Sequence, residues 1–212
     1  MNAPRPQTLS DVRAAYAGRA EEYAGLLGTV ASLAAPDLAF VGAWARSVTG
    51  SVIDVGCGPG QWTDWLRSQG VEVEGIDPVP EFVRLAQQAY PRSNFRVAQA
   101  EATGLADGAC GGVLAWYSLI HTDPAGIDEA LNEFSRIVRP GGSLALGFFE
   151  GPELAAFDHA ITTAYAWPAK LLAERLEVAG FAVERSESRT DPGSRRHGAM
   201  TAVALAPRSG RA

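Results

Sequence analysis

The stretch Ser51 to Trp62, SVIDVGCGPGQW, constrains the fold of this chain more than any other. Its first half is a short apolar run that predicts a buried strand, and three glycines spaced two residues apart follow, Gly56, Gly58 and Gly60. Glycine permits a sharp backbone turn and a close approach of the chain to a ligand. A glycine loop at the carboxyl end of a first strand, ahead of a helix with free N–H groups, indicates a nucleotide site in an open α/β sheet.

The rest of the chain predicts such a sheet, in the doubly wound form. After Gly50, strands and helices alternate at a spacing typical of a mostly parallel sheet covered on both faces. The predicted strands are 51–56, 71–77, 94–100, 111–121, 143–150, 181–189 and 199–207, and the predicted helices are 60–70, 80–90, 127–142 and 168–181. Only a loop separates the last two strands, so one of these seven strands must run antiparallel to the others.

One domain is predicted over residues 1–212, because this length suits a single core and neither a linker nor a repeat interrupts it. Residues 8–48 have apolar side chains at helical spacing and predict two or three helices. We interpret them as a helical lid over an α/β core of residues 50–206. Tyr16 and Tyr23 share one helix face in this lid, where their rings either attract a cationic ligand or simply pack.

Charge and composition exclude several classes of protein. A net charge of −6 argues against sequence-independent binding of nucleic acid. Two cysteines, Cys57 and Cys110, make neither a disulfide framework nor a metal site, and no acidic cluster predicts a metal. The polar, proline-containing N-terminus is unlike a secretory signal, and no apolar run reaches the roughly 20 residues that cross a bilayer. We expect a soluble, cytoplasmic monomer or homodimer that does not bind membranes.

Two kinds of nucleotide compete for the glycine loop. The dinucleotide fingerprint G-x-G-x-x-G needs a glycine where this chain has Gln61, so a nicotinamide-dependent oxidoreductase is the less favoured alternative. Asp54, just ahead of the glycines, would repel a pyrophosphate and favours a net cationic ligand, such as a nucleoside that carries an amino acid on a sulfonium. Asp77 ends the second strand, where an acid accepts the hydroxyl groups of a ribose.

These residues resemble the motifs of class I S-adenosylmethionine-dependent methyltransferases. VIDVGCGPG resembles the first motif, VEGIDP the second, and AEATGL the loop after the third strand, and the resemblance extends from about Tyr16 to Ala206. Other segments resemble a bacterial small-molecule subgroup. The resemblance implies a Rossmann-like methyltransferase fold with a seven-stranded sheet, an antiparallel last strand and a helical N-terminal lid. It also implies S-adenosyl-L-methionine as the methyl donor.

The resemblance further implies that the donor is bound by Tyr16, Tyr23, Gly56, Gly58, Gly60, Asp77, Glu101 and Ala102. We also expect Asp54, Pro78 and Trp116 to contact it. The chain departs from the common pattern at Glu101, where most members have an aspartate that faces the adenine amine. It departs again in ACGGV, which lacks the phenylalanine and aspartate that many members have before the fourth strand.

His121 is the candidate general base. It ends the predicted fourth strand at the carboxyl edge of the sheet, and an imidazole pKa of about 6.5 suits proton removal near neutral pH. The alternative is a histidine that only holds the following loop. On the acceptor side we expect Tyr117, His159 and Tyr165, and we interpret His197, at the start of the last strand, as structural. The function expected is methyl transfer to a hydroxyl or amine of a metabolite, and the main alternative is a non-catalytic module that binds the donor or its demethylated product.

Overall fold

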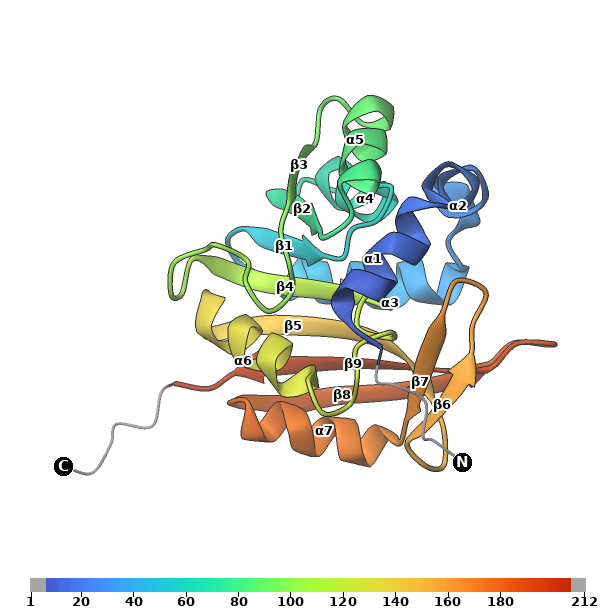
Figure 1. The fold of residues 1–212 in the computed structure, drawn as a ribbon. Coiled ribbons are helices and arrows are strands. Elements are labelled where there is room, and N and C mark those ends of the chain that lie inside the picture. The colour runs from blue at the N-terminus through green and yellow to red at the C-terminus, as the bar shows by residue number, and fades with distance from the viewer. Residues whose placement is uncertain (1–6, 207–212) are drawn as a thin grey trace.

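The computed structural model describes residues 7–206, which form a nine-stranded sheet and its covering helices (Figure 1). The helices are α1 (Leu9–Ala17), α2 (Ala20–Leu27), α3 (Ala35–Ser47), α4 (Gln61–Ser68), α5 (Pro80–Ala89), α6 (Ile127–Ile137) and α7 (Ala169–Val178), with a 3₁₀ turn at Val30–Ser32. The strands are β1 (Val52–Val55), β2 (Val73–Asp77), β3 (Asn94–Val97), β4 (Cys110–Trp116), β5 (Val138–Glu150), β6 (Ala155–Asp158), β7 (Thr163–Trp167), β8 (Phe181–Thr190) and β9 (Arg196–Ala204).

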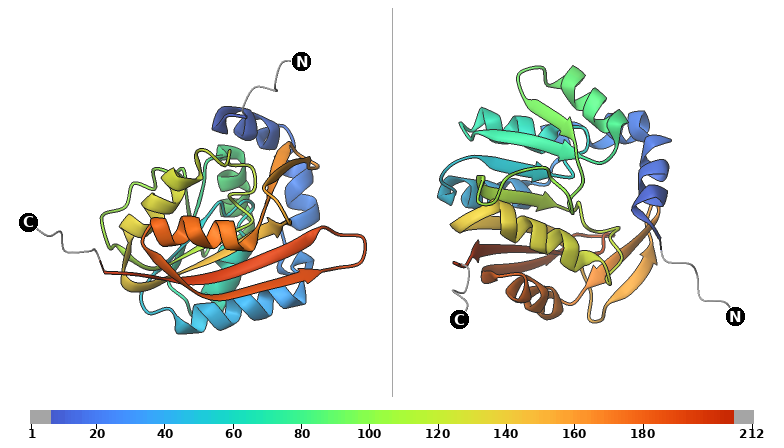
Figure 2. Two further views of the ribbon diagram at one scale, coloured as in Figure 1. Left: turned by 90° about the horizontal axis from the view of Figure 1, so that it is seen from below. Right: turned by 60° about the vertical axis from the view of Figure 1, so that its left-hand side comes forward.

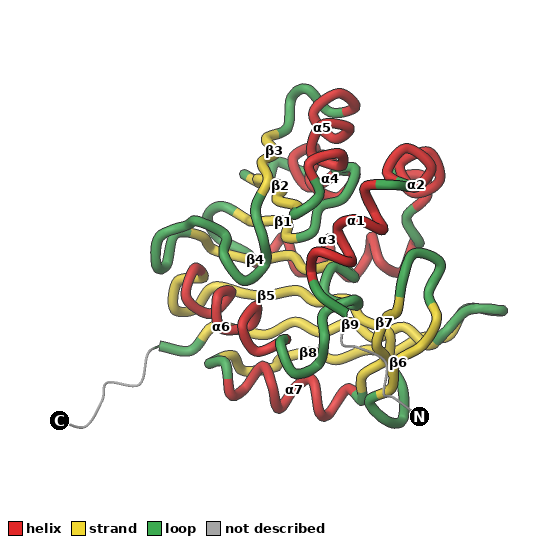
Figure 3. Tube along the Cα trace, viewed as in Figure 1, coloured by secondary structure: helices red, strands yellow, loops and turns green. Residues whose placement is uncertain are grey.

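The seven strands that the sequence predicts follow the order β3-β2-β1-β4-β5-β9-β8 across the sheet. Strand β1 pairs in parallel with β2 and β4, and β4 pairs in parallel with β5. Strand β9 is antiparallel to both of its neighbours, β5 and β8. The mostly parallel, Rossmann-like sheet with an antiparallel last strand is therefore confirmed, and Figure 3 shows its strands side by side in yellow.

The sheet also contains two strands that the sequence analysis did not predict. Strands β6 and β7 form an antiparallel hairpin, and β7 pairs in parallel with Phe149 and Glu150 at the end of β5. The hairpin stands at the same end of the sheet as the start of α1 (Figure 1). Its strands are only four and five residues long. So short a run carries too little alternation of apolar and polar residues to predict a strand.

Alternate residues of the central strands face opposite layers of helices. In β1, Val52 packs with residues of α3 and α4, whereas Ile53 and Val55 pack with residues of α6 and α7. Figure 2 shows this arrangement, with α3 on one side of the sheet and α6 and α7 on the other. Phe134 of α6 and Leu66 of α4 are fully buried, one in each layer. None of the helices within residues 7–206 is long and apolar enough to cross a membrane.

The lid is shorter than the segment 8–48 that the sequence indicated. Phe40, Val41 and Trp44 of α3 are buried against the sheet, so α3 belongs to the core. Helices α1 and α2, for which we keep the name lid, pack instead on the start of α5 at Phe82.

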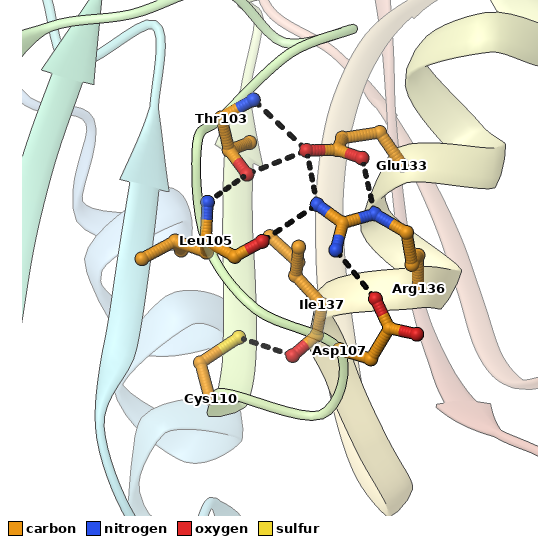
Figure 4. Close-up of polar contacts among 7 residues, drawn as sticks. All are labelled: Thr103, Leu105, Asp107, Cys110, Glu133, Arg136 and Ile137. Atoms are coloured by element: carbon orange, nitrogen blue, oxygen red, sulfur yellow. Dashed lines mark hydrogen bonds and ion pairs between the residues drawn. The ribbon is translucent and has the colours of Figure 1, made fainter.

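A polar network fixes the loop between β3 and β4 to α6 (Figure 4). Glu133 accepts hydrogen bonds from the backbone N–H and the hydroxyl of Thr103, at 2.9 and 2.6 Å. Arg136 donates to Glu133 at 2.8 Å and to Asp107 at 2.6 Å. The Arg136 guanidinium, together with Thr103, lowers the pKa of Glu133 to about 2, so the network is charged at neutral pH. It holds in place the loop that carries Glu101.

Candidate active site

A cavity of about 710 Å³ opens at the carboxyl ends of the central strands. It lies beside β1 and β4, where the connections leave in opposite directions and where open α/β sheets bind ligands. Its volume lies within the range of small-molecule sites, roughly 300–1,000 Å³. Among residues 7–206, no group of histidine, cysteine, aspartate or glutamate side chains is arranged to hold a metal ion.

Most of the residues that the sequence analysis singled out line this cavity. From the lid and the glycine loop come Tyr16, Tyr23, Gly56 and Gly58. From β2 and the loop after β3 come Asp77, Pro78 and Glu101. From β4, the loop after it and the β6–β7 hairpin come Trp116, Tyr117, His121 and His159.

Asp54 lies outside the lining, which corrects the expectation that it contacts the donor. It lies on β1 and turns toward α4, where it accepts a hydrogen bond from Thr63 Oγ1 at 2.6 Å. The side chain is 2% exposed, and burial raises the pKa of Asp54 to about 7, with the Thr63 hydrogen bond acting against the shift. Asp54 therefore ties the first strand to α4 beneath the glycine loop.

Three further expected contacts also lie outside the lining. A Cβ atom on Gly60 would come within 2.7 Å of the Phe95 ring, so this glycine permits helix–strand packing. Ala102 turns its backbone N–H back to the carbonyl of Gln99 at 3.2 Å, and it is Gln99 that reaches the cavity. Tyr165 lies on β7 without lining the cavity.

The glycine loop leaves room for a ligand at one point. Gly56 and Gly58 have φ values of +71° and +53°, which side-chain-bearing residues rarely adopt. A Cβ atom on Gly56 would be 2.3 Å from the Cβ of Ser118, whereas a Cβ on Gly58 would meet nothing within 4 Å. Gly56 is required by the packing of the loop against the segment after β4. Gly58 keeps the backbone open toward the cavity.

Asp77, the last residue of β2, is the acid that lies beside Gly58 at the cavity. Its two carboxylate oxygens accept the backbone N–H groups of Gly58 and Val79, at 2.9 and 2.8 Å. Burial raises the pKa of Asp77 to about 6, and the two backbone hydrogen bonds act against that shift. A carboxylate has about four acceptor sites, so two remain for the hydroxyl groups of a ligand.

The lid contributes an aromatic wall. The rings of Tyr16, Tyr23 and Phe82 have centroids 5.4 to 5.6 Å apart. Burial raises the pKa of both tyrosines, so their hydroxyls stay protonated. Neutral ring faces of this kind attract a cation that lies within about 6 Å.

His121 lies in the loop after β4, since the strand ends at Trp116 and not at His121 as expected. His121 Nδ1 is 2.7 Å from the carbonyl oxygen of Thr163 and must carry the proton, because a carbonyl only accepts. Nε2 therefore accepts the hydroxyl of Tyr16 at 2.9 Å. Burial lowers the pKa of His121 to about 4. With both ring nitrogens engaged, the geometry fits the structural alternative and not a free base.

The opposite wall contains residues that the sequence analysis missed. His197, interpreted as structural, lines the cavity together with Phe149, and its Nδ1 is 2.7 Å from the hydroxyl of Tyr117. His197 stands opposite Phe149 in the β5–β9 register. Period-two alternation along β9 was a usable signal, but the register with β5 is not visible in the sequence. Arg189 and Gln61 also line this cavity.

Several buried polar atoms around the cavity have no protein partner. They are Gln61 Oε1, Trp116 Nε1, Ser118 Oγ and His159 Nδ1. Buried polar groups in folded proteins are nearly always hydrogen-bonded. Four such atoms in residues around one cavity favour a site that binds a polar ligand.

Residues 52–142 match the family model described as a methyltransferase domain, a segment that runs from β1 into β5 and includes Asp77 and Glu101. The chain is 35% identical over 95 residues to an uncharacterized methyltransferase of Mycobacterium bovis, covering 45% of this chain and 38% of the relative. It is 37% identical over 95 residues to the malonyl-[acyl-carrier protein] O-methyltransferase of Pseudescherichia vulneris, covering 45% and 37%. The chain thus spans well under half the length of the curated relatives it matches.

Among solved structures, the fold is similar to that of the 1,6-didemethyltoxoflavin-N1-methyltransferase of Burkholderia thailandensis, which was crystallised with 1,6-didemethyltoxoflavin and S-adenosylhomocysteine. The TM-score is 0.79 at 23% identity, over 97% of this chain and 94% of that chain. The glycine loop, the acid at the end of β2 and the matched domain agree with this likeness in fold. Residues 52–142 therefore match a methyltransferase domain, and the chain as a whole has the Rossmann-like fold of this solved methyltransferase.

Proposed function

We propose that this protein transfers the methyl group of S-adenosyl-L-methionine to a small-molecule acceptor that is held in the same cavity. One observation carries the proposal: the open space beside Gly58 adjoins the Asp77 carboxylate, which keeps acceptor sites free for ribose hydroxyls. Glu101 lines the same cavity, where its carboxylate is available to an adenine amine. These residues fit a nucleoside that carries a cationic amino acid.

The lid and the unpartnered polar atoms support the same assignment. The neutral rings of Tyr16 and Tyr23 are suited to a sulfonium, because aromatic faces attract cations. Gln61, which takes the place of the third glycine in the dinucleotide fingerprint, lines the cavity with its side-chain oxygen unpartnered. That oxygen favours a ligand with N–H donors over a pyrophosphate, so a nicotinamide-dependent oxidoreductase stays the less favoured alternative.

The residues of the cavity have mainly to bind and orient the reactants. Bound S-adenosyl-L-methionine supplies an activated methyl group and a neutral leaving group, so the protein has no oxyanion to stabilise. Holding the acceptor in line at about 3 to 3.5 Å contributes roughly 7 to 11 kcal/mol in well-oriented intramolecular models. The cavity volume of about 710 Å³ favours an acceptor of small-molecule size beside the donor.

The relatives support a small acceptor. The enzyme from Pseudescherichia vulneris is named for a malonyl group on an acyl-carrier protein, and the one from Burkholderia thailandensis was crystallised with 1,6-didemethyltoxoflavin. The net charge of −6 on this chain disfavours nucleic acid as an alternative acceptor.

Calorimetric titration of the full chain with S-adenosyl-L-methionine, S-adenosylhomocysteine and NAD tests the proposal. We expect both adenosyl compounds to bind and NAD not to bind. Asp77→Ala should weaken donor binding by about 10- to 100-fold, which corresponds to the loss of hydrogen bonds to a charged group. Asp77→Asn should weaken it less, because an amide still accepts one hydroxyl.

Asp128→Asn is the matched control, because Asp128 is a partly exposed carboxylate in the ion pair with Arg175 and does not line the cavity. Donor affinity that is unchanged in Asp77→Ala, with unfolding midpoints equal to wild type, would contradict the proposal. Donor binding without methyl transfer to any acceptor would instead favour the non-catalytic binding module.

A further inference from the structure

The wall of the cavity formed by β4, β5 and β9 is aromatic. The ring of Tyr117 lies 5.5 Å from the rings of both Phe149 and His197, and the ring of His159 lies 5.9 Å from that of Phe149. All four residues line the cavity. Aromatic side chains favour offset-stacked or edge-to-face contacts at such distances. The wall therefore fits a planar, aromatic or heteroaromatic acceptor.

Tyr117 has an unusual backbone conformation in this wall. Its φ is +58°, and it is the only non-glycine residue with a positive φ among residues 7–206. For an L-residue this conformation costs about 1–2 kcal/mol. It occurs immediately after the last residue of β4, at the edge of the cavity. A bulky residue held in such a conformation at a binding site favours a functional role for its side chain.

The hydroxyl of Tyr117 begins a chain of hydrogen bonds whose direction can be worked out. Ser194 Oγ donates to the carbonyl of Arg195 at 2.9 Å, so it can only accept from His197 Nε2, which is 2.7 Å away. His197 therefore carries its proton on Nε2. Its Nδ1 has a free lone pair and accepts the hydroxyl of Tyr117 at 2.7 Å. The chain leads from the cavity to Ser194, which is exposed at the surface.

The other histidines of the cavity differ from His197 in their hydrogen bonds. The hydrogen bonds of His121 end at the carbonyl oxygen of Thr163, which has no proton to pass on. His159 Nδ1 is buried without a protein partner. Among the hydrogen bonds described for these histidines, those of His197 lead to an exposed hydroxyl.

Burial keeps the imidazole of this path neutral, and the charged groups around it act on its pKa in both directions. Arg189 is paired with Asp37 on α3 and with Asp191, the latter at 3.1 Å. Burial and then Arg189 lower the pKa of His197, while Asp37 and Asp191 act against that shift. Burial raises the pKa of Tyr117, with Asp37 and Asp191 adding to the shift and Arg189 opposing it. At neutral pH the path thus holds a protonated phenol and an imidazole that is free to take up a proton.

We propose that Tyr117 is a catalytic residue that accepts the proton of a planar acceptor, and that His197 and Ser194 are positioning residues that pass a proton to solvent. This rests on the proposed function. As the acceptor oxygen or ring nitrogen forms its bond to the methyl carbon, the carbon–sulfur bond breaks and its electron pair stays on sulfur. The acceptor proton moves to Tyr117 Oη, the phenol proton moves to His197 Nδ1, and the Nε2 proton moves to Ser194 Oγ. The proton of this exposed hydroxyl passes to water once the hydroxyl has turned away from the carbonyl of Arg195. The acceptor class is a phenol, an enol or a heteroaromatic ring N–H.

The acceptor class is tested with the full chain and methyl-labelled S-adenosyl-L-methionine. The probes are catechol and lumazine, which carry a neutral O–H or ring N–H, and benzoate, an aromatic anion without such a proton. We expect methylation of catechol or lumazine and none of benzoate. Methylation of benzoate alone, or donor binding with no methylation of either neutral probe, overturns the inference.

Three variants test the path itself with the better probe. Tyr117→Phe should lower kcat by about 100-fold, the lower end for general acid–base catalysis, with the calorimetric affinity for S-adenosyl-L-methionine unchanged. His197→Gln should lower kcat and abolish the acid limb of the pH–rate profile, which a merely structural role would not do. Ser194→Ala should lower kcat less, and Ser188→Ala, an exposed serine of β8, is its matched control and should have no effect.

A second measurement is independent of turnover. The chain has three histidines, so ¹⁵N-histidine NMR resolves each imidazole, and His197 should show the Nε2–H tautomer with a shift of Nδ1 in Tyr117→Phe. An Nδ1–H tautomer, or wild-type kcat in Tyr117→Phe with the donor bound, overturns the path and leaves the proposed function standing. Failure of the wild type to bind the donor defeats the proposed function instead.

Discussion

Two tyrosine–histidine pairs stand on different walls of one cavity and differ in where their hydrogen bonds end. In the lid pair, the hydroxyl of Tyr16 is bonded to His121, whose other nitrogen donates to a backbone carbonyl on β7. In the sheet pair, the hydroxyl of Tyr117 is bonded to His197, whose other nitrogen donates to an exposed serine. The same two residue types thus form a closed clamp in one place and an open path in the other.

The difference lies in the partner of the second ring nitrogen and not in the histidine itself. A carbonyl fixes the imidazole in one tautomer and gives the proton nowhere to go, whereas a hydroxyl both accepts and donates. His121 is also 5% exposed, while His197 is half-buried. A histidine near a reactive centre therefore has to be judged by both of its nitrogens before it is assigned as a base.

The largest expected difference between the two pairs is the loss of unfolding free energy that acidification causes through the His121 pair. Burial lowers the pKa of His121 from its ordinary value of 6.5 to about 4, so between these pH values the unfolded chain binds a proton that the folded protein does not. The free energy of unfolding should fall by up to about 3 kcal/mol as the pH drops through this range. His121→Asn keeps a donor for Thr163 but cannot titrate, and in urea unfolding it should remove this dependence.

Two carboxylates titrate over the same range with the opposite sign. Burial raises the pKa of Asp54 to about 7 and that of Asp77 to about 6, so their stabilising contribution decreases as the pH rises. Both are present in wild type and in His121→Asn, and they cancel in the difference between the two curves. Parallel curves would show that His121 is not the buried neutral group described above.

Truncation of each histidine should rank the pairs in the same order. His121→Ala removes two hydrogen bonds and leaves the Tyr16 hydroxyl without a partner, which should cost about 2–4 kcal/mol of unfolding free energy. The Thr163 carbonyl keeps Gln7 as its remaining donor. His197→Ala removes a half-buried ring and should cost about 1 kcal/mol. Urea unfolding at neutral pH measures both changes in unfolding free energy, provided that the m-values are equal. Equal losses in His121→Ala and His197→Ala would contradict the distinction between the closed clamp and the open path.

Removal of the two tyrosine hydroxyls should affect different steps. Tyr16→Phe leaves His121 Nε2 without its donor and loosens the lid over the donor site, so affinity for S-adenosyl-L-methionine should fall by about fivefold, the equivalent of one hydrogen bond. Tyr117→Phe serves as the matched variant, and its affinity should match wild type. Calorimetry decides, and a larger loss in Tyr117→Phe than in Tyr16→Phe would reverse the roles of the two walls.

The smallest effect is expected at the outer end of the lid. Arg19 pairs with Glu22 and reaches the carbonyl of Ala160, but the pair is exposed. Arg19→Met should therefore change the unfolding free energy by less than about 0.5 kcal/mol. A loss above 1 kcal/mol in the same urea experiment would show that the contacts of Arg19 stabilise the lid more than this comparison with Tyr16 predicts.

The parts of the site that the sequence predicts are those that local chemistry determines. The strand β1, the positive-φ glycines and Asp77 belong to one unit, β1–α4–β2, in which the backbone N–H of Gly58 donates to Asp77. The sequence also allows a prediction that the Asp54 side chain lies on the same face of β1 as Val52, since residues two positions apart in a strand share a face. What the sequence hides depends on distant contacts.

Two features show that limit. His197 reaches the cavity because β9 pairs with β5 in a register that places it opposite Phe149, and no local pattern sets that register. The short end of β4 moves His121 into a loop whose geometry depends on the β6–β7 hairpin and on the lid. The residue type and its place at the sheet edge were enough to select His121, whereas His197 was interpreted as structural. Only the tertiary contacts of each ring assign its role.

The attachments of the lid have a consequence for the step that limits the turnover rate of the proposed reaction. Gln7 donates to carbonyls of both His121 and Thr163, so the first turn of the lid is joined to the hairpin as well as to the loop after β4. Ligand exchange then requires these attachments to part together, as a single cooperative event. Departure of the spent nucleoside, and not the displacement at carbon, would in that case set the ceiling on turnover.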